Sequence, residues 1–71
     1  MPYQVKTSMY YEDVLEWLQE NVGELLWSRP IVEWKGRGWS MHGLGITQQG
    51  ARYIVRIDDY KLAVLAGLKL S

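Results

Sequence analysis

The stretch from Trp34 to Trp39 reads Trp-Lys-Gly-Arg-Gly-Trp, and it constrains the fold more than any other part of the sequence. A two-residue turn at Gly36-Arg37, with glycine first, is typical of the loop that joins two twisted antiparallel strands. Such a turn places Trp34 opposite Trp39 in a non-hydrogen-bonded pair, where cross-strand side chains approach most closely. We therefore predict a hairpin whose two indoles stack on the core face of a sheet.

The strand before this turn is expected to run from Leu25 past Pro30 to Lys35. Proline cannot donate a hydrogen bond to a neighbouring strand, so Pro30 places this segment at a sheet edge or at a bulge. Counting outward from the turn sets Val32 against Met41 on the face that bears the two tryptophans. We expect these two side chains to extend the core.

Four further segments complete the expected fold. Alternating apolar side chains predict strands, and apolar residues at helical spacing predict helices. The last segment also alternates, which leaves a strand open there. A cap at Asp58 or Asp59, an alanine-rich interior and a stop at Gly67 favour a helix. The four segments are a strand over 2–7, a helix over 9–22 capped by Thr7 or Ser8, a strand over 52–58 and a helix over 60–66.

These elements predict a two-layer α+β domain of order β-α-β-β-β-α that takes in residues 1–71. Its sheet is mainly antiparallel, and both helices are expected on the tryptophan-bearing face. A chain of 71 residues is enough for one domain only. It has no cysteine and no apolar run of about 20 residues that could span a bilayer. The first residues lack the pattern of a signal peptide, so we expect a cytoplasmic protein without membrane association.

Charge is unevenly distributed along the chain, although the net charge is zero. Residues 7–28 contain five carboxylates and no base, and the rest of the chain is correspondingly basic. Glu12, Glu16 and Glu20 stand at successive i,i+4 positions of the first helix and form one row. An ordinary solvated face explains this row. The alternative is an acidic ridge on which a basic partner docks.

Basic side chains and one tryptophan are expected on the sheet face that points away from the core. Cations hold phosphates while rings stack on bases, so such a face suits single-stranded nucleic acid. The net charge of zero argues against this function, because nucleic-acid-binding domains are usually basic. A solvated face, or one covered by a partner subunit, is the alternative. The candidate residues are Trp27, Arg29, Lys35, Arg37, His42, Arg52 and Arg56.

The sequence offers little for catalysis. His42 is the only histidine and cysteine is absent, so zinc and thiol chemistry lack ligands. Ser40, His42 and Glu33 share a face in the expected register. Same-strand neighbours of this kind stand about 6–7 Å apart, and nothing indicates an oxyanion hole. We expect no catalytic residue, no cofactor and no bound metal.

The last segment is apolar on nearly every side, which is typical of a helix buried on two sides. Leu62, Leu65 and Leu68 lie on one stripe of this helix, and a protein this small cannot easily cover Val64 and Leu70 as well. We therefore expect a homodimer, with Leu62, Leu65 and Leu68 as its candidate contacts. A short, aromatic-rich sequence without cysteine is typical of an accessory protein of phage or mobile-element type. We expect a non-catalytic protein-interaction module with a regulatory or inhibitory role, whose partner is another protein or a second copy. A small nucleic-acid-binding module is the alternative function.

Overall fold

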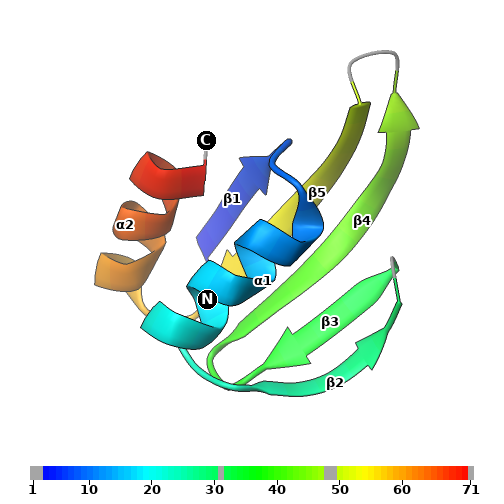
Figure 1. The fold of residues 1–71 in the computed structure, drawn as a ribbon. Helices are drawn as coiled ribbons and strands as arrows, with labels where there is room; N and C mark the ends of the chain where they lie inside the picture. The colour runs from blue at the N-terminus through cyan, green and yellow to red at the C-terminus, as the bar shows by residue number, and fades with distance from the viewer. Residues whose placement is uncertain (1–2, 31, 48–49, 71) are drawn as a thin grey trace.

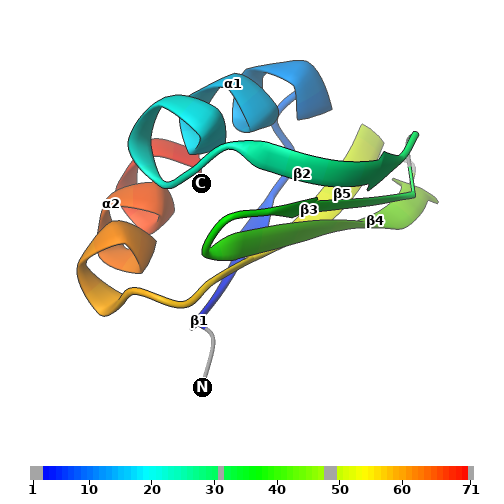
Figure 2. The ribbon, with the colours of Figure 1, turned by 90° about the horizontal axis from the view of Figure 1, so that it is seen from below.

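The helices and strands form where helical spacing and alternation predict them, with one strand more than expected. The computed structural model describes residues 3–30, 32–47 and 50–70. In chain order the elements are β1 (Tyr3–Thr7), α1 (Tyr11–Asn21), β2 (Leu25–Arg29), β3 (Glu33–Gly36), β4 (Trp39–Thr47), β5 (Gly50–Ile57) and α2 (Tyr60–Leu70). The sheet has the order β1-β5-β4-β3-β2, and every neighbouring pair is antiparallel. Both helices lie on one side of the twisted sheet, which makes a two-layer α+β fold (Figures 1 and 2).

The core lies between the sheet and the two helices. Alternation sends Tyr53, Val55 and Ile57 of β5 inward, as predicted. Tyr11 of α1 packs onto the inner face of the sheet, where its ring stacks on that of Trp34 with the centroids 5.6 Å apart. The buried apolar residues are Val5, Val14, Leu18, Trp34, Trp39, Met41, Tyr53, Val55, Ile57, Ala63, Ala66 and Leu70.

The last segment is a helix, as its aspartate and alanines predicted. Asp59 caps it, because its Oδ1 accepts a hydrogen bond from the Leu62 N–H at 3.0 Å. The helix does not stop at Gly67 but continues to Leu70. The Leu70 side chain is buried, and its carbonyl accepts a hydrogen bond from the Thr7 hydroxyl of β1. Burying a leucine stabilises by about 1.5–3 kcal/mol, which outweighs the roughly 1 kcal/mol that glycine costs inside a helix.

The first helix begins two residues later than predicted. It starts at Tyr11 rather than Met9, and no side chain caps it. The Thr7 hydroxyl oxygen instead accepts a hydrogen bond from the Met9 N–H at 3.1 Å. Thr7 therefore closes the turn between β1 and α1, and the prediction that Thr7 or Ser8 caps the helix is wrong.

The turn of the β3–β4 hairpin lies one residue further along the chain than predicted. Its two loop residues are Arg37 and Gly38, and Gly38 has a φ of +82°. Gly36 rather than Trp34 lies opposite Trp39, so the two indoles are not a cross-strand pair. The partner of Trp39 differs from the predicted one by two residues, and such a shift leaves every side chain on its face. Trp34 and Trp39 are both buried, as expected.

The long strand predicted over 25–35 is two strands. The Val32 N–H donates to the Arg29 carbonyl at 3.0 Å, and β3 pairs antiparallel with β2. Val32 is 52% exposed and does not belong to the core, which corrects its predicted pairing with Met41. Pro30 accounts for the change, because proline cannot continue a strand ladder and its fixed φ suits a turn. The extra strand places β2 at the sheet edge.

Candidate binding surfaces

The sheet face turned away from the helices, here called the outer face, carries every charged side chain of the described strands. Its residues line up across the strands, because each register partner of an outward side chain also points outward. One row contains Gln4, Arg56, Ser40, Lys35 and Trp27, and the next contains Lys6, Ile54, His42, Glu33 and Arg29. Arg52 follows on the same side of β5.

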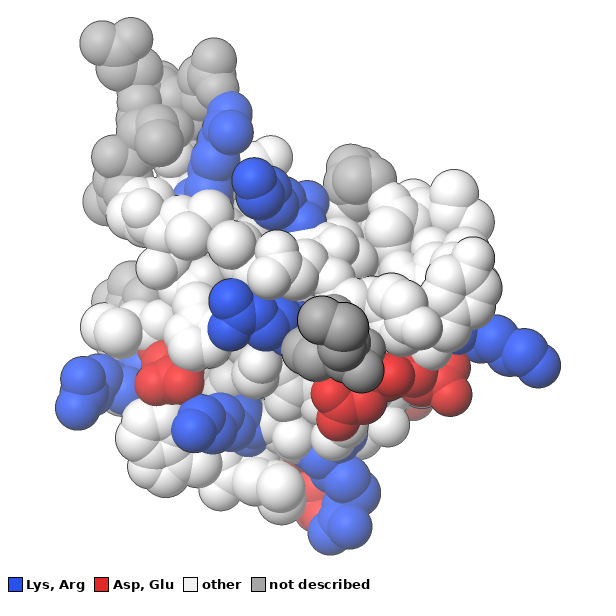
Figure 3. Space-filling model, turned by 180° about the vertical axis from the view of Figure 1, so that it is seen from behind, with Lys and Arg blue, Asp and Glu red and all other residues white. Residues whose placement is uncertain are grey.

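Positive charge dominates the outer face. Glu33 is its only carboxylate among the described strand residues. The Glu33 Oε2 atom lies 4.0 Å from Lys35 Nζ and 3.6 Å from His42 Nε2. Figure 3 views this side of the molecule and shows Lys and Arg side chains scattered across it, with smaller patches of Asp and Glu among them. The bases that the strands contribute are Lys6, Arg29, Lys35, Arg52 and Arg56.

Trp27 lies on this face near the sheet edge. Trp27 is 48% exposed, although large aromatic side chains such as tryptophan usually bury their area in a core or an interface. The ammonium of Lys35, its register partner on β3, stands 5.8 Å from the ring centroid. An exposed ring beside a cation is an arrangement that can stack on a flat ligand and hold an anion next to it.

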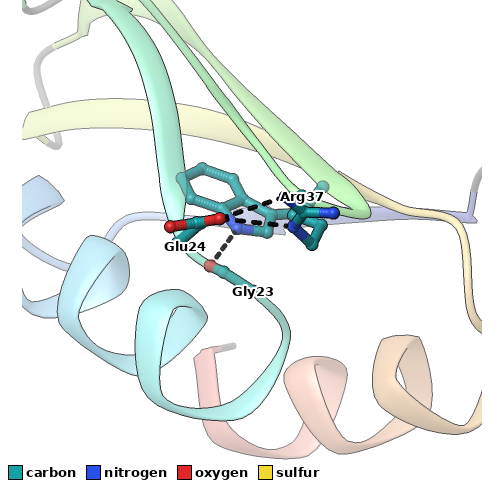
Figure 4. Close-up of polar contacts among 4 residues, drawn as sticks. Gly23, Glu24 and Arg37 are labelled. Carbon is teal, nitrogen blue, oxygen red and sulfur yellow. Dashed lines mark hydrogen bonds and ion pairs between the residues drawn. The ribbon is translucent and has the colours of Figure 1, made fainter.

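Arg37, a candidate together with the basic residues of this face, lies at the hairpin tip and pairs with a carboxylate of another segment. Its Nη2 atom stands 3.1 Å from Glu24 Oε1, and its backbone N–H donates to the Glu24 carbonyl at 2.9 Å (Figure 4). Beside it, the Trp39 Nε1–H donates to the Gly23 carbonyl at 2.8 Å. These contacts tie the hairpin turn to the loop that follows α1, so Arg37 has a structural role.

The predicted acidic ridge lies on the helix layer. Glu12, Glu16 and Glu20 are all exposed on α1. Glu16 and Glu20, together with Asp13, line a hollow beside the end of α2 that also contains Lys69. Glu12 is not part of this hollow. The sequence pattern found the carboxylate row but not the lysine facing it, because that contact depends on how the helices pack.

The candidate dimer residues of α2 differ in exposure. Leu62 packs partly against the core, whereas Leu65 is 52% and Leu68 78% exposed. Leu65 and Leu68 line a groove between α1 and α2 together with Trp17, Asn21 and Lys69. We call this the helix groove. The expectation that Leu70 is difficult to cover is wrong, since Leu70 is buried.

The remaining polar groups form no evident reactive centre in the part of the chain that the structure describes. Glu33 and His42 are register partners on β3 and β4, and Ser40 lies opposite Lys35 instead. No three His, Cys, Asp or Glu side chains within 3–30, 32–47 and 50–70 converge as a metal site would require. The pKa of Tyr11 is raised above its ordinary value, chiefly by its neighbour Tyr10.

Comparison of the chain with protein-family models, with curated proteins and with solved structures finds no match. Neither α1 nor α2, the helices of the described ranges, has the length and apolar character needed to cross a membrane. The outer face and the helix groove are the two candidate binding surfaces of the described residues.

Proposed function

We propose that this protein is a non-catalytic interaction module that binds protein through the helix groove, with a second copy of the chain as its partner and a regulatory or inhibitory outcome. The observation that carries the proposal is the exposure of Leu65 and Leu68 beside Trp17. Covering a leucine side chain contributes about 1.5–3 kcal/mol. Covering two adjacent leucines in a groove therefore contributes substantially to the free energy of binding a partner.

The charges around the helix groove favour a second copy over an unrelated surface. α2 carries Lys61 and Lys69 and no carboxylate, whereas the exposed side of α1 carries carboxylates and no base. In a twofold dimer each patch meets the same patch of the other copy. With the twofold axis along the groove, α2 of one copy lies against α1 of its partner, so that lysines approach carboxylates while the leucines are covered.

Sedimentation equilibrium from micromolar to millimolar concentration tests this function. The protein should self-associate, and Leu65→Glu and Leu68→Glu should be monomeric with nearly unchanged thermal stability. Leu44→Glu is the matched control, because Leu44 is a comparably exposed leucine at 50% but lies at the β4 bulge, away from the groove. A strict monomer at millimolar concentration, or a Leu44→Glu variant that dissociates as readily as Leu68→Glu, would contradict the proposal.

A further inference from the structure

We infer that the outer face binds single-stranded nucleic acid, with a base stacked on Trp27 and phosphates held by Lys35 and Arg56. This site lies on the opposite layer from the helix groove, so it goes beyond the proposed function and does not depend on it. A dimer formed through the helices would leave both outer faces free.

The fold separates the charges of the chain between its two layers. The chain has no net charge, yet the described strands direct five bases and one carboxylate to the same face. α1 holds a large share of the carboxylates on the other layer. Because exposed charges are screened beyond about 8–10 Å, a ligand on the outer face experiences its bases more than the remote carboxylates. The neutral composition therefore does not exclude a polyanion here.

One row of the outer face presents its side chains in an order that suits an extended strand of nucleic acid. Arg56, Ser40, Lys35 and Trp27 are successive register partners from β5 to β2. Neighbouring strands lie about 4.8 Å apart, so this row extends over about 14 Å. It presents a cation, a hydroxyl, a second cation and an exposed ring in turn. An extended strand of nucleic acid laid along it can place phosphates on the cations and a base on the indole.

An exposed aromatic ring on the outer face favours nucleic acid over an acidic protein segment. An acidic peptide needs cations but no stacking platform. Trp27 is nearly half exposed beside Lys35, and His42 stands exposed by about a third in the next row. A base stacked on an aromatic side chain contributes about 1–3 kcal/mol, and every base has a face to offer. The face belongs to a five-stranded sheet, which is broader than the α-helix or two-stranded ribbon that the major groove of duplex DNA admits, and this favours single strands.

Fluorescence anisotropy with labelled oligo(dT) and oligo(U) tests the inference. The logarithm of the binding constant should fall linearly with the logarithm of the salt concentration. Arg56→Gln and Lys35→Gln should each reduce the magnitude of this slope by about 0.7, the value for one phosphate contact on a single strand. Trp27→Ala should weaken binding roughly 5- to 150-fold, which is the stacking energy of about 1–3 kcal/mol expressed as an affinity ratio. Trp27→Phe, which retains a ring, should restore most of that loss.

Lys61→Gln, introduced together with Leu68→Glu so that self-association does not contribute, is the matched control, because it removes one positive charge from the helix layer. It should leave both affinity and salt slope nearly unchanged, and thermal melting should show that every variant is folded. Absence of salt-dependent binding would overturn the inference, as would equal losses for Lys61→Gln and Arg56→Gln. Binding of poly-glutamate as strong as that of the oligonucleotides, with Trp27→Ala neutral, would also overturn it and assign the face to an acidic protein segment. Leu68→Glu should bind the oligonucleotides through the same face, so failure of self-association and failure of this inference are distinguishable.

Discussion

The indole of Trp39 lies directly over Gly36, its register partner across the β3–β4 hairpin, so a side chain at position 36 would occupy the space of the ring. Gly36→Ala must therefore displace a buried indole that also donates a hydrogen bond to the Gly23 carbonyl. We expect it to destabilise the protein by about 1–3 kcal/mol in urea unfolding, as overpacking of a core does.

Gly67→Ala is the control for that substitution. A Cβ at position 67 meets no atom within 4 Å, and the residue lies inside α2. Alanine is the better helix former, so this variant should gain about 0.5–1 kcal/mol. If Gly36→Ala is as stable as the parent, the ring does not cover Gly36 in solution.

The two buried tryptophans of the hairpin should matter far more to stability than the exposed one. Trp34→Ala or Trp39→Ala empties a large aromatic site in the core and should cost about 3–5 kcal/mol. That can equal the whole stability of a domain of this size. Trp27→Ala should change stability by only about 0.5 kcal/mol, because Trp27 lies at the surface. Thermal melts of the three variants check the ranking, and equal melting temperatures would contradict the described core.

The sequence predicts which face each side chain takes better than it predicts which strands pair. The inward set of β5 follows from alternation alone, because the period of two belongs to the strand itself. The hairpin register is different, since both Gly36 and Gly38 can adopt a positive φ. The Trp39 ring decides between them, because it fits only over a residue without a side chain. That contact is visible only once the hairpin is folded.

The outer face and the helix groove, the two candidate surfaces, were predictable to different extents for the same reason. The outer face tolerates a register error of two residues, so Trp27, Lys35 and Arg56 lie on it as the sequence indicated. Lys6 was missed, although its alternation within β1 could have placed it there. Arg37 could not be assigned, because its carboxylate partner is 13 residues away in a loop. The helix groove depends on how the two helices pack and has no local signal.

The cap of α2 gives a prediction that is independent of both surfaces. Asp59 Oδ1 accepts a hydrogen bond from the Leu62 N–H, which would otherwise lack a partner at the start of the helix. Asp59→Ala should lower the free energy of unfolding by about 0.5–2 kcal/mol. Asp58→Ala removes the same charge one residue earlier and is the control. Similar losses for the two variants would show that charge rather than the cap is responsible.

Replacing Glu16 should separate stability from association. Glu16 stands one helical turn from both Glu12 and Glu20, so Glu16→Lys replaces two repulsions by two attractions. Each pair is worth about 0.2–0.5 kcal/mol, and the isolated domain should become slightly more stable. Self-association should weaken, because the proposed dimer brings lysines of α2 toward this row. Glu16→Gln should give an intermediate result in both measurements, and unaltered association of Glu16→Lys would remove the acidic ridge from the interface.

The four tryptophans lie in different parts of the structure, so each part can be followed through its own indole. Trp34 and Trp39 lie in the core, Trp17 lies in the helix groove and Trp27 lies on the outer face. Each indole N–H gives its own signal in a nitrogen–proton correlation NMR spectrum, and single Trp→Phe variants assign the four signals.

The most direct test of the central claim, that the helix groove binds a second copy of the chain, is to follow these signals as the protein is diluted from millimolar to micromolar concentration. We expect the Trp17 signal to shift with concentration while the signals of Trp34, Trp39 and Trp27 stay in place. A Trp17 signal that does not move over the whole range, or a Trp27 signal that moves in its place, would contradict the claim.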